Sequence, residues 1–366
     1  MVTMKDVAAA AGVSSATVSN AYNRPSKLSA AQRDHVLEVA SELGYTGPHP
    51  GASSLRTGSV GAVGLLITDR LAYAFEDPAA MMLMRGIAQV SQMADMSLTL
   101  LPGGGRLPSP DREMQTDWPA VRRSVVDGFL VYSLPDNHPA VQSVMHRRSP
   151  VVLIDSPRLD GVPFVGIDDR SAARSAADHL LGLGHTRVGV LVDRLLPDGN
   201  SGIASQARIR RAADGVARDR MHGIQDSLRS AGIPLSSVPV SEAGGFLFEE
   251  APHAVEVLLD RHEVTGIVAT TDVLALTALD VLRSRRLDVP GDVSVIGFDD
   301  IPAAEKVGLT TIAQPLVEKG RVAAELILQV MAGKPVGTTI LPTSLVQRLT
   351  TGPPAKVRNP KRQRSA

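Results

Sequence analysis

Residues 5–20 read KDVAAAAGVSSATVSN, and this stretch predicts two short helices joined by a tight turn. Gly12 permits the backbone to reverse between the helices, and Ser14 can cap the second one. Apolar residues recur at helical spacing on both sides of the turn: Val7, Ala8 and Ala11 before it, Val13 and Val18 after it. Each helix therefore has one face able to pack against a neighbour.

A third helix is expected after residue 28. Ser29 and Gln32 have the spacing of a capping box, and Gly44 can end the helix. The apolar positions between them are Val36, Leu37, Ala40 and Leu43. Three helices this short form a core only by packing together, which is the arrangement of helix-turn-helix DNA-binding modules.

The order and spacing of several short motifs resemble the lactose repressor and galactose repressor (LacI/GalR) family. These motifs are Asp6-Val7-Ala8, Ala11-Gly12-Val13-Ser14, Thr17-Val18-Ser19, Leu43-Gly44-Tyr45 and Ser54-Leu55-Arg56-Thr57-Gly58. A helix-turn-helix pattern alone also suits a plain helical bundle, but the combination favours DNA binding. The resemblance implies a DNA-binding head over residues 1–46 and a hinge over 47–59.

By the same resemblance, Ser15, Ala16 and Asn20 lie on the face of the second helix that meets base edges, and Asn23 belongs to the DNA contacts. Asn can pair with adenine, and Ala can contact a thymine methyl group. A good helix start is the alternative explanation for Ser15 and Ala16. Residues 1–58 hold five Lys or Arg against four acids, so bulk charge attracts DNA weakly. Phosphate contacts are instead assigned to hydroxyl groups: Thr3, Ser14, Thr17 and Ser19.

The segment 47–59 is punctuated by Pro and Gly, which by itself suggests a flexible linker. The family makes it a hinge whose helix forms only with DNA and the partner chain, since about seven residues are too few for an isolated helix. Leu55 then matches the apolar residue inserted into the minor groove to kink the operator. Gly47-Pro48-His49-Pro50 and Ser53 depart from the family's usual pattern here.

The composition excludes several kinds of protein. The chain has 366 residues, 43% of them hydrophobic, and this length suggests two or three domains. It has no Cys, its formal net charge is zero, and its His residues lack metal-ligand spacing, so no metal site or cofactor is expected. No signal peptide opens the chain, and no apolar run approaches the ~20 residues that span a bilayer. We expect a cytoplasmic protein without a membrane partner.

From Val60 onward, apolar strands alternate with amphipathic helices, which predicts an α/β fold with doubly wound parallel sheets. Strands are expected over 60–68, 96–101, 128–132, 151–154, 187–192, 266–270 and 293–298, and helices over 79–94, 171–183, 272–285 and 317–331. The resemblance implies a two-lobed effector domain of the periplasmic-binding-protein type over 60–354, with crossovers near residues 157, 314 and 342. Lobe 1 then holds 60–157 and 315–342, and lobe 2 holds 158–314 and 343–354. Residues 355–366 are expected to form a basic, disordered tail.

Four polar residues resemble ligand contacts of the family: Asp155, Arg220, Asp272 and Asp299. Carboxylates and a guanidinium group can each hold vicinal hydroxyls through paired hydrogen bonds, which favours a sugar-like or nucleoside-like effector. Two alternatives stay open. Asp272 can be a helix cap, and Asp299 can merely order its own loop.

Aromatic residues are scarce, and five of the 11 fall where predicted strands end or loops follow: Tyr73, Phe75, Phe246, Phe248 and Phe298. Ligands of open α/β sheets bind at the carboxyl ends of strands, so stacking on a sugar or base is expected of Tyr73, Phe75 and Phe246. Burial against the sheet edge is the alternative. Residues 73–78 replace the family's commoner Asn-Pro-Phe-Phe, and Asp77 within them is also assigned to the ligand. The segment 193–219 is expected to be a solvated loop.

These observations predict a homodimeric transcriptional repressor that binds a near-palindromic operator and responds to a small molecule bound between its lobes. A periplasmic solute-binding protein is the alternative, because it shares the two-lobed architecture, but residues 1–58 argue against it. An enzyme is not expected, since no nucleophile, metal or cofactor motif is present and the fold alone confers no activity.

Overall fold

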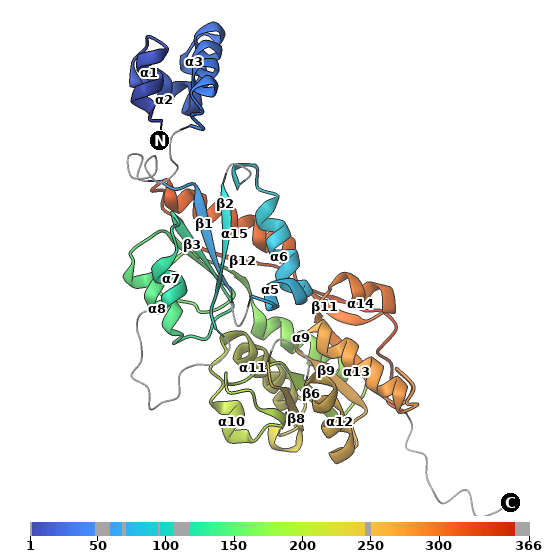
Figure 1. The fold of residues 1–366 in the computed structure, drawn as a ribbon. Helices are drawn as coiled ribbons and strands as arrows, with labels where there is room; N and C mark the ends of the chain where they lie inside the picture. Colours follow the sequence, from blue (N-terminus) through green and yellow to red (C-terminus); the bar gives the residue numbers. More distant parts are fainter. Residues whose placement is uncertain are drawn as a thin grey trace, which may run out of the picture. The chain divides into compact units, whose positions relative to one another are not determined.

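The computed structural model describes residues 2–47, 59–67, 71–93, 96–104, 118–245 and 250–355. Contacts within the chain divide it between Gly61 and Ala62 into two compact units, the head and the effector unit (Figure 1). Three predicted features lie outside the described residues: Leu55 of the hinge, Phe246, and the basic tail from residue 356 onward.

The head contains the three predicted helices, α1 (Met4–Ala10), α2 (Ser15–Asn23) and α3 (Ala30–Glu42), with a short 3-10 turn, η1 (Pro25–Lys27). Val7, Val18 and Val36, one from each helix, are fully buried and form the centre of its core. Ser14 caps α2 and Ser29 caps α3, as the spacing predicts. Thr3 and Asp6 form a reciprocal capping box at α1, whereas at α3 Ser29 accepts from the N–H of Gln32.

The first sheet of the effector unit has six strands, all paired in parallel, in the order β12-β5-β4-β3-β1-β2. Its strands are β1 (Ala62–Ile67), β2 (Ser97–Pro102), β3 (Gly128–Tyr132), β4 (Val151–Ile154), β5 (Phe164–Ile167) and β12 (Thr338–Leu341). Helices α6 (Pro78–Ala88) and α15 (Leu316–Met331) cover one face, and α7 (Pro119–Arg123) and α8 (Pro139–His146) cover the other. The short turns α5 (Tyr73–Glu76) and η2 (Ser91–Met93) complete this lobe. Because both faces are covered, β1, β3 and β4 are buried along their whole length.

The second sheet has seven strands in the order β13-β11-β10-β9-β6-β8-β7 and is parallel except at its two edges. Its strands are β6 (Val188–Val192), β7 (Ser201–Ile203), β8 (Val240–Ala243), β9 (Gly266–Ala269), β10 (Ser294–Asp299), β11 (Thr310–Ala313) and β13 (Ser344–Val346). Helices α9 (Asp169–Gly182) and α11 (Gly215–Ser230) pack on one face. Helices α12 (Ala251–Arg261), α13 (Asp272–Ser284) and α14 (Pro302–Val307) pack on the other, and α10 (Gln206–Arg210) and η3 (Leu235–Ser237) are short.

The first crossover between the lobes lies at Asp168, and the boundary predicted near residue 157 is wrong. Strand β5 pairs with β4 on one side and with β12 on the other, so it belongs to the first sheet. The buried run Phe164–Ile167 is only four residues long, which makes its pattern easy to miss. The second and third crossovers lie at Gln314–Pro315 and at Pro342–Thr343.

Each lobe contains a pair of helices that pack backbone against backbone. A Cβ atom added at Gly86 of α6 would lie 1.9 Å from the carbonyl oxygen of Val317 in α15, and one at Gly320 of α15 would lie 2.0 Å from that of Leu83. In lobe 2, a Cβ at Gly223 of α11 would lie 2.0 Å from the carbonyl oxygen of Arg170 in α9. Glycine is therefore required at these close helix crossings.

The segment 193–219 is structured, so the predicted solvated loop is wrong. It contains β7, α10 and the start of α11. Glu242 at the end of β8 is fully buried and accepts hydrogen bonds from Arg208 Nε (2.5 Å) and from the backbone N–H of Leu195 (2.6 Å). Arg208 also pairs with Asp198 at 2.6 Å. A buried carboxylate thus holds a segment whose charges alone suggested exposure.

No helix among the described residues is long and apolar enough to cross a membrane.

Candidate functional site

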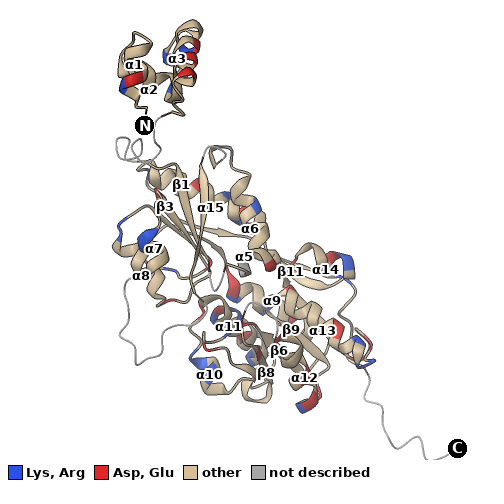
Figure 2. Ribbon diagram, in the orientation of Figure 1, with Lys and Arg blue, Asp and Glu red and all other residues tan. Residues whose placement is uncertain are grey.

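The outer face of α2 has the chemistry expected of a DNA-reading surface. Ser15 and Ala16 are exposed, Asn20 is half-buried one turn later, and Asn23 is exposed one turn beyond that. This spacing places Ala16, Asn20 and Asn23 along one side of the helix. Lys, Arg, Asp and Glu occur on α1 and α3 but not on α2 (Figure 2). The surface of α2 therefore offers hydrogen bonds and methyl groups rather than charge.

The hydroxyl groups assigned to phosphate differ in their availability. Thr3 and Ser14 are exposed at the starts of α1 and α2, and the Ser14 and Thr17 hydroxyls lie 2.9 Å apart. Ser19 is only 6% exposed and accepts a hydrogen bond from the side chain of Asn23 at 3.4 Å. Ser19 thus belongs to the interior of the head, which corrects its assignment as a DNA contact.

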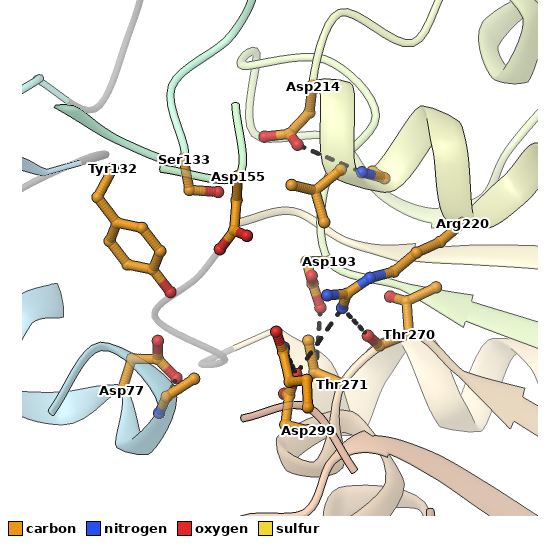
Figure 3. A pocket seen from close by; sticks show the side chains of 14 residues that line it. Asp77, Tyr132, Ser133, Asp155, Asp193, Asp214, Arg220, Thr270, Thr271 and Asp299 are labelled. Atoms are coloured by element: carbon orange, nitrogen blue, oxygen red, sulfur yellow. Dashed lines mark hydrogen bonds and ion pairs between the residues drawn. The ribbon is translucent and has the colours of Figure 1, made fainter. Parts of the chain in front are cut away.

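A pocket lies between the two lobes at the carboxyl ends of the strands, as expected for open α/β sheets (Figure 3). The space between its lining atoms is about 580 Å³, solvent at its mouth included. Its lining from lobe 1 is Asp77, Ala79, Tyr132, Ser133 and Asp155. Its lining from lobe 2 and the second crossover is Asp193, Asp214, Val216, Ala217, Arg220, Thr270, Thr271, Asp299 and Gln314.

Arg220 reaches from α11 toward the loops that follow β9 and β10 (Figure 3). Its Nε donates to Asp169 at 2.8 Å, and its Nη1 donates to the carbonyl oxygen of Thr270 at 2.5 Å and lies 3.9 Å from Asp299 Oδ1. The guanidinium carbon lies 3.7 Å from the centre of the Phe298 ring. Hydrogen bonds and stacking on an aromatic ring together fix the orientation of this buried cation.

A chain of polar contacts, three of whose residues line the pocket, crosses from lobe 2 to lobe 1. Asp299 Oδ1 accepts a hydrogen bond from Gln314 Nε2 at 2.5 Å, and Gln314 Oε1 accepts one from Lys319 Nζ at 2.6 Å. The same Lys319 Nζ lies 2.7 Å from Asp155 Oδ1. Gln314 stands at the crossover, and Lys319 on α15 is fully buried. The chain therefore links one pocket carboxylate of each lobe through a crossover.

The backbone is unusual at the same edge of the sheets. Ser133, Asp155 and Asp299, at the ends of β3, β4 and β10, have positive φ angles of 52°, 61° and 125°. Positive φ is costly for residues other than glycine and tends to occur at functional sites. All three residues line the pocket.

Burial changes the acidity of the pocket carboxyls. It raises the pKa of Asp193 to about 7, against the opposing effect of Arg220, and the neighbouring Asp214 and Asp77 raise it further. Burial also raises the pKa of Asp299 well above its ordinary value, again against Arg220. The environment of the pocket therefore disfavours the ionised form of some of its carboxyl groups.

The structure brings four of the predicted ligand residues together in this pocket: Asp77, Asp155, Arg220 and Asp299. Asp272 does not line it, and its assignment is corrected. Its fully buried carboxylate accepts hydrogen bonds from the Ile301 N–H at 2.9 Å and the Thr311 hydroxyl at 2.6 Å, so it braces the loop after β10. The cap of α13 is Thr271, so Asp272 is not a helix cap either.

The aromatic residues predicted to contact the ligand have different outcomes. Phe75 is 64% exposed and is absent from the pocket lining, so its assignment is also corrected. It lies on the single turn α5. Phe298 is buried beneath Arg220. Tyr73 begins α5, but its side chain, like Phe246, lies outside the description.

Several residues that line the pocket were not predicted from the sequence, although a simple rule identifies them. Ser133, Asp193 and Thr270 each stand at the end of a strand that the pattern predicts. Polar residues at carboxyl ends of parallel strands are candidates for ligand contact. Asp214, the cap of α11, gives no comparable signal because its approach depends on the fold of residues 193–213.

Comparisons with known proteins agree with this architecture. Residues 3–47 match the profile of the bacterial regulatory proteins of the lacI family, and residues 177–351 match the periplasmic binding protein-like domain. The chain is 42% identical to the HTH-type transcriptional regulator Rv3575c of Mycobacterium tuberculosis, over 96% of this chain and 98% of that protein. A helix-turn-helix head joined to a two-lobed domain with a pocket defines a class of proteins, the DNA-binding transcriptional regulators.

Solved structures of the same class are similar over nearly the whole chain. One is a LacI family transcriptional regulator from Corynebacterium glutamicum, with 32% identity, a TM-score of 0.74 and coverage of 95% of this chain and 98% of that one. Another is the transcriptional regulator CelR in complex with cellobiose, with 26% identity, a TM-score of 0.64 and coverage of 96% and 100%. The chain belongs to the lacI family of bacterial regulatory proteins. The helix-turn-helix head argues against the alternative that the chain is a periplasmic solute-binding protein.

Proposed function

We propose that this regulator is a repressor, that two copies of the chain bind a near-palindromic operator, and that a polyhydroxylated small molecule in the pocket between the lobes controls operator affinity. The α2 residues Ser15, Ala16, Asn20 and Asn23 read bases. Thr3, Ser14 and Thr17 contact phosphates. The hinge residue Leu55 wedges the minor groove at the operator centre.

The polar chain from Asp299 to Asp155 is the observation that carries the ligand's role. It passes through Gln314 at a crossover and through the buried Lys319, so groups that line the pocket in both lobes share one set of contacts. A second contact between the lobes, Arg218 with Asp136 at 2.5 Å, lies beside the pocket. A ligand bonded to both Asp155 and Asp299 therefore favours one arrangement of the lobes over another.

The sign of regulation follows from linkage. A ligand that prefers the lobe arrangement unable to dock both hinges lowers operator affinity and acts as an inducer. A ligand with the opposite preference raises that affinity and acts as a corepressor. The CelR neighbour carries cellobiose in its solved complex, which supports a sugar-like class of effector.

The DNA-binding part is tested by selecting genomic fragments with the purified full chain at a stated, near-physiological salt concentration. A palindromic motif should be enriched, and Leu55→Ala should bind it more weakly than the wild type. Glu38→Ala, an exposed position on α3, is a suitable control. Equal binding of all fragments by the wild type would contradict the proposed reading of sequence.

The regulatory part is tested on the selected fragment and its promoter. Titration with free pentoses, hexoses, sugar alcohols and nucleosides should identify a compound that changes operator affinity. Arg220→Lys, which cannot reproduce the present bonds to Asp169 and Thr270, should remove that response. Deletion of the gene should raise transcription from the promoter. A fall in transcription would overturn the repressor assignment.

A further inference from the structure

The inference concerns the charge of the ligand and rests on the proposed function of the pocket. Five carboxyl groups and one guanidinium group belong to its described lining residues. No three His, Asp or Glu side chains among the described residues are placed to hold a metal ion. The acidic groups therefore face an organic ligand rather than a cation held by protein alone.

The single cation of the described lining is already engaged. Arg220 donates to Asp169 and to the Thr270 carbonyl oxygen, and one face of its guanidinium group stacks on Phe298. The neighbouring cations Lys319 and Arg194 pair with Asp155 at 2.7 Å and with Asp214 at 3.2 Å. The described lining thus has little positive charge to give to an anion.

Helix N-termini are the other common anion sites, because their backbone N–H groups lack partners. Three helices of the described chain, α6, α11 and α13, begin at this pocket; α6 and α11 are capped by carboxylates, and α13 is capped by the Thr271 hydroxyl, with the buried Asp272 in its first turn. Asp77 accepts from the N–H groups of Ala79 (3.3 Å) and Ala80 (3.0 Å), and Asp214 accepts from that of Ala217 (3.3 Å). The caps occupy the positions that a phosphate group would otherwise take.

One lining hydroxyl lacks a hydrogen-bond partner among the described residues. Thr270 is 2% exposed, and its hydroxyl oxygen has no hydrogen-bond partner among the described residues. A buried hydroxyl without a partner is costly, so a ligand that supplies a hydroxyl or amino group would satisfy it. Asp155, Asp193 and Asp299 offer acceptor oxygens at the same carboxyl edge.

We propose that the pocket selects a polyhydroxylated molecule that carries no anionic group, and that it rejects phosphate esters and sugar acids. Hydroxyl or ammonium groups of such a ligand donate to the carboxylates. A phosphate group would instead stand among five carboxyl groups with no free cation in the described lining. Repulsion from the carboxylates that stay ionised, together with the lack of a free cation in the described lining, weakens binding by on the order of 100-fold.

The test uses the purified full chain and two kinds of compound. First, ³¹P line broadening reports whether inorganic phosphate binds. The wild type should leave the line sharp, whereas Asp214→Ser should broaden it, because serine keeps the α11 cap and removes one carboxylate from the pocket lining. Asp168→Ser is the matched control, since Asp168 caps α9 at an exposed position outside the pocket.

Second, calorimetry compares free ribose, glucose, sorbitol and cytidine with the phosphate esters of the same compounds. Each ester should bind at least about 100-fold more weakly than its parent. The proposal is overturned if the wild type binds inorganic phosphate in competition with a parent compound, or if an ester binds as well as its parent. It is also overturned if Asp214→Ser gains no more phosphate binding than Asp168→Ser.

These outcomes distinguish a failure of the charge selectivity from a failure of the proposed function. If operator affinity responds to none of the compounds, the effector role fails while the phosphate experiment still decides the charge selectivity. If an ester binds tightly and changes operator affinity, the charge selectivity fails and the effector role stands.

Discussion

Lys319 Nζ lies 2.7 Å from Asp155 Oδ1 in the interior of lobe 1, where the lysine side chain has no exposed surface. Desolvation makes such a pair expensive to form, but removal of one partner leaves a buried charge without compensation. The pair is one link of the contacts that join the pocket to the second crossover. Both stability and communication between the lobes should therefore depend on it.

Replacement of Lys319 by methionine tests this pair. Lys319→Met should destabilise the effector unit by about 3–5 kcal/mol, because the Asp155 carboxylate stays buried without its cation. Thermal unfolding measures the loss. The double variant Lys319→Met with Asp155→Asn should recover a large part of it. Lys334→Met, at an exposed position after α15, controls for the loss of a lysine in general. If Lys319→Met has the same melting temperature as the wild type, that result would contradict the buried pair.

Asn20 should determine base preference. Asn20→Ala removes an amide able to pair with adenine, which is worth about 1–3 kcal/mol, or roughly a 5- to 150-fold loss of operator affinity. Fluorescence anisotropy with the selected fragment measures the loss, and affinity for unrelated DNA should stay nearly unchanged. Equal losses on both kinds of DNA would assign Asn20 to phosphate rather than base contact.

Asp193 gives the effector unit a dependence on pH. Burial raises its folded-state pKa from an ordinary 3.8 to about 7. Since the unfolded chain ionises first, the stability contributed by the protonated form is complete below about pH 4 and is lost as pH rises through 7. Asp193→Asn keeps a neutral side chain, so its melting temperature relative to the wild type should rise between about pH 5 and pH 8. Asp280→Asn, at an exposed site on α13, should show no such trend.

The close helix pairs predict opposite effects of the same substitution. Gly223→Ala places a Cβ atom 2.0 Å from a backbone oxygen of α9 and should destabilise lobe 2 by about 1–3 kcal/mol or more. Gly182→Ala, near the end of α9, meets no atom within 4 Å and should stabilise the protein by up to about 1 kcal/mol. Thermal unfolding separates the two, and similar effects at both positions would refute the close crossing.

Local sequence patterns were sufficient to predict those helices, strands and caps whose structure depends mainly on their own residues. The strand Gly128–Tyr132 lies in a sheet covered on both faces, so its uninterrupted apolar run identifies it. The helix caps Ser14 and Ser29 follow from residue type and spacing alone. The pocket residues Asp155, Arg220 and Asp299 came from the family resemblance, and the rule on strand ends would have added Asp193.

Contacts between residues far apart in the sequence explain the features that the local sequence pattern could not predict. A lysine at position 319 predicts an exposed helix face. The side chain of Lys319 is buried because it pairs with Asp155, which is far away in the chain. Asp272 opens a helix after a strand, as a ligand residue would, yet its carboxylate turns inward to Thr311 and Ile301. The basic segment near Arg208 folds because Glu242 is buried beside it.

The three crossovers also set an order for biosynthesis. Strands β1 to β5 leave the ribosome first, but α15, which covers one face of their sheet, and β12, which completes its edge, are translated only after nearly all of lobe 2. Chains emerge at about 5–20 residues per second, so the apolar face beneath α15 stays without this helix for about 7–30 seconds. The lobe that begins synthesis first is thus finished last, and during that interval its uncovered apolar face makes the nascent chain prone to aggregation.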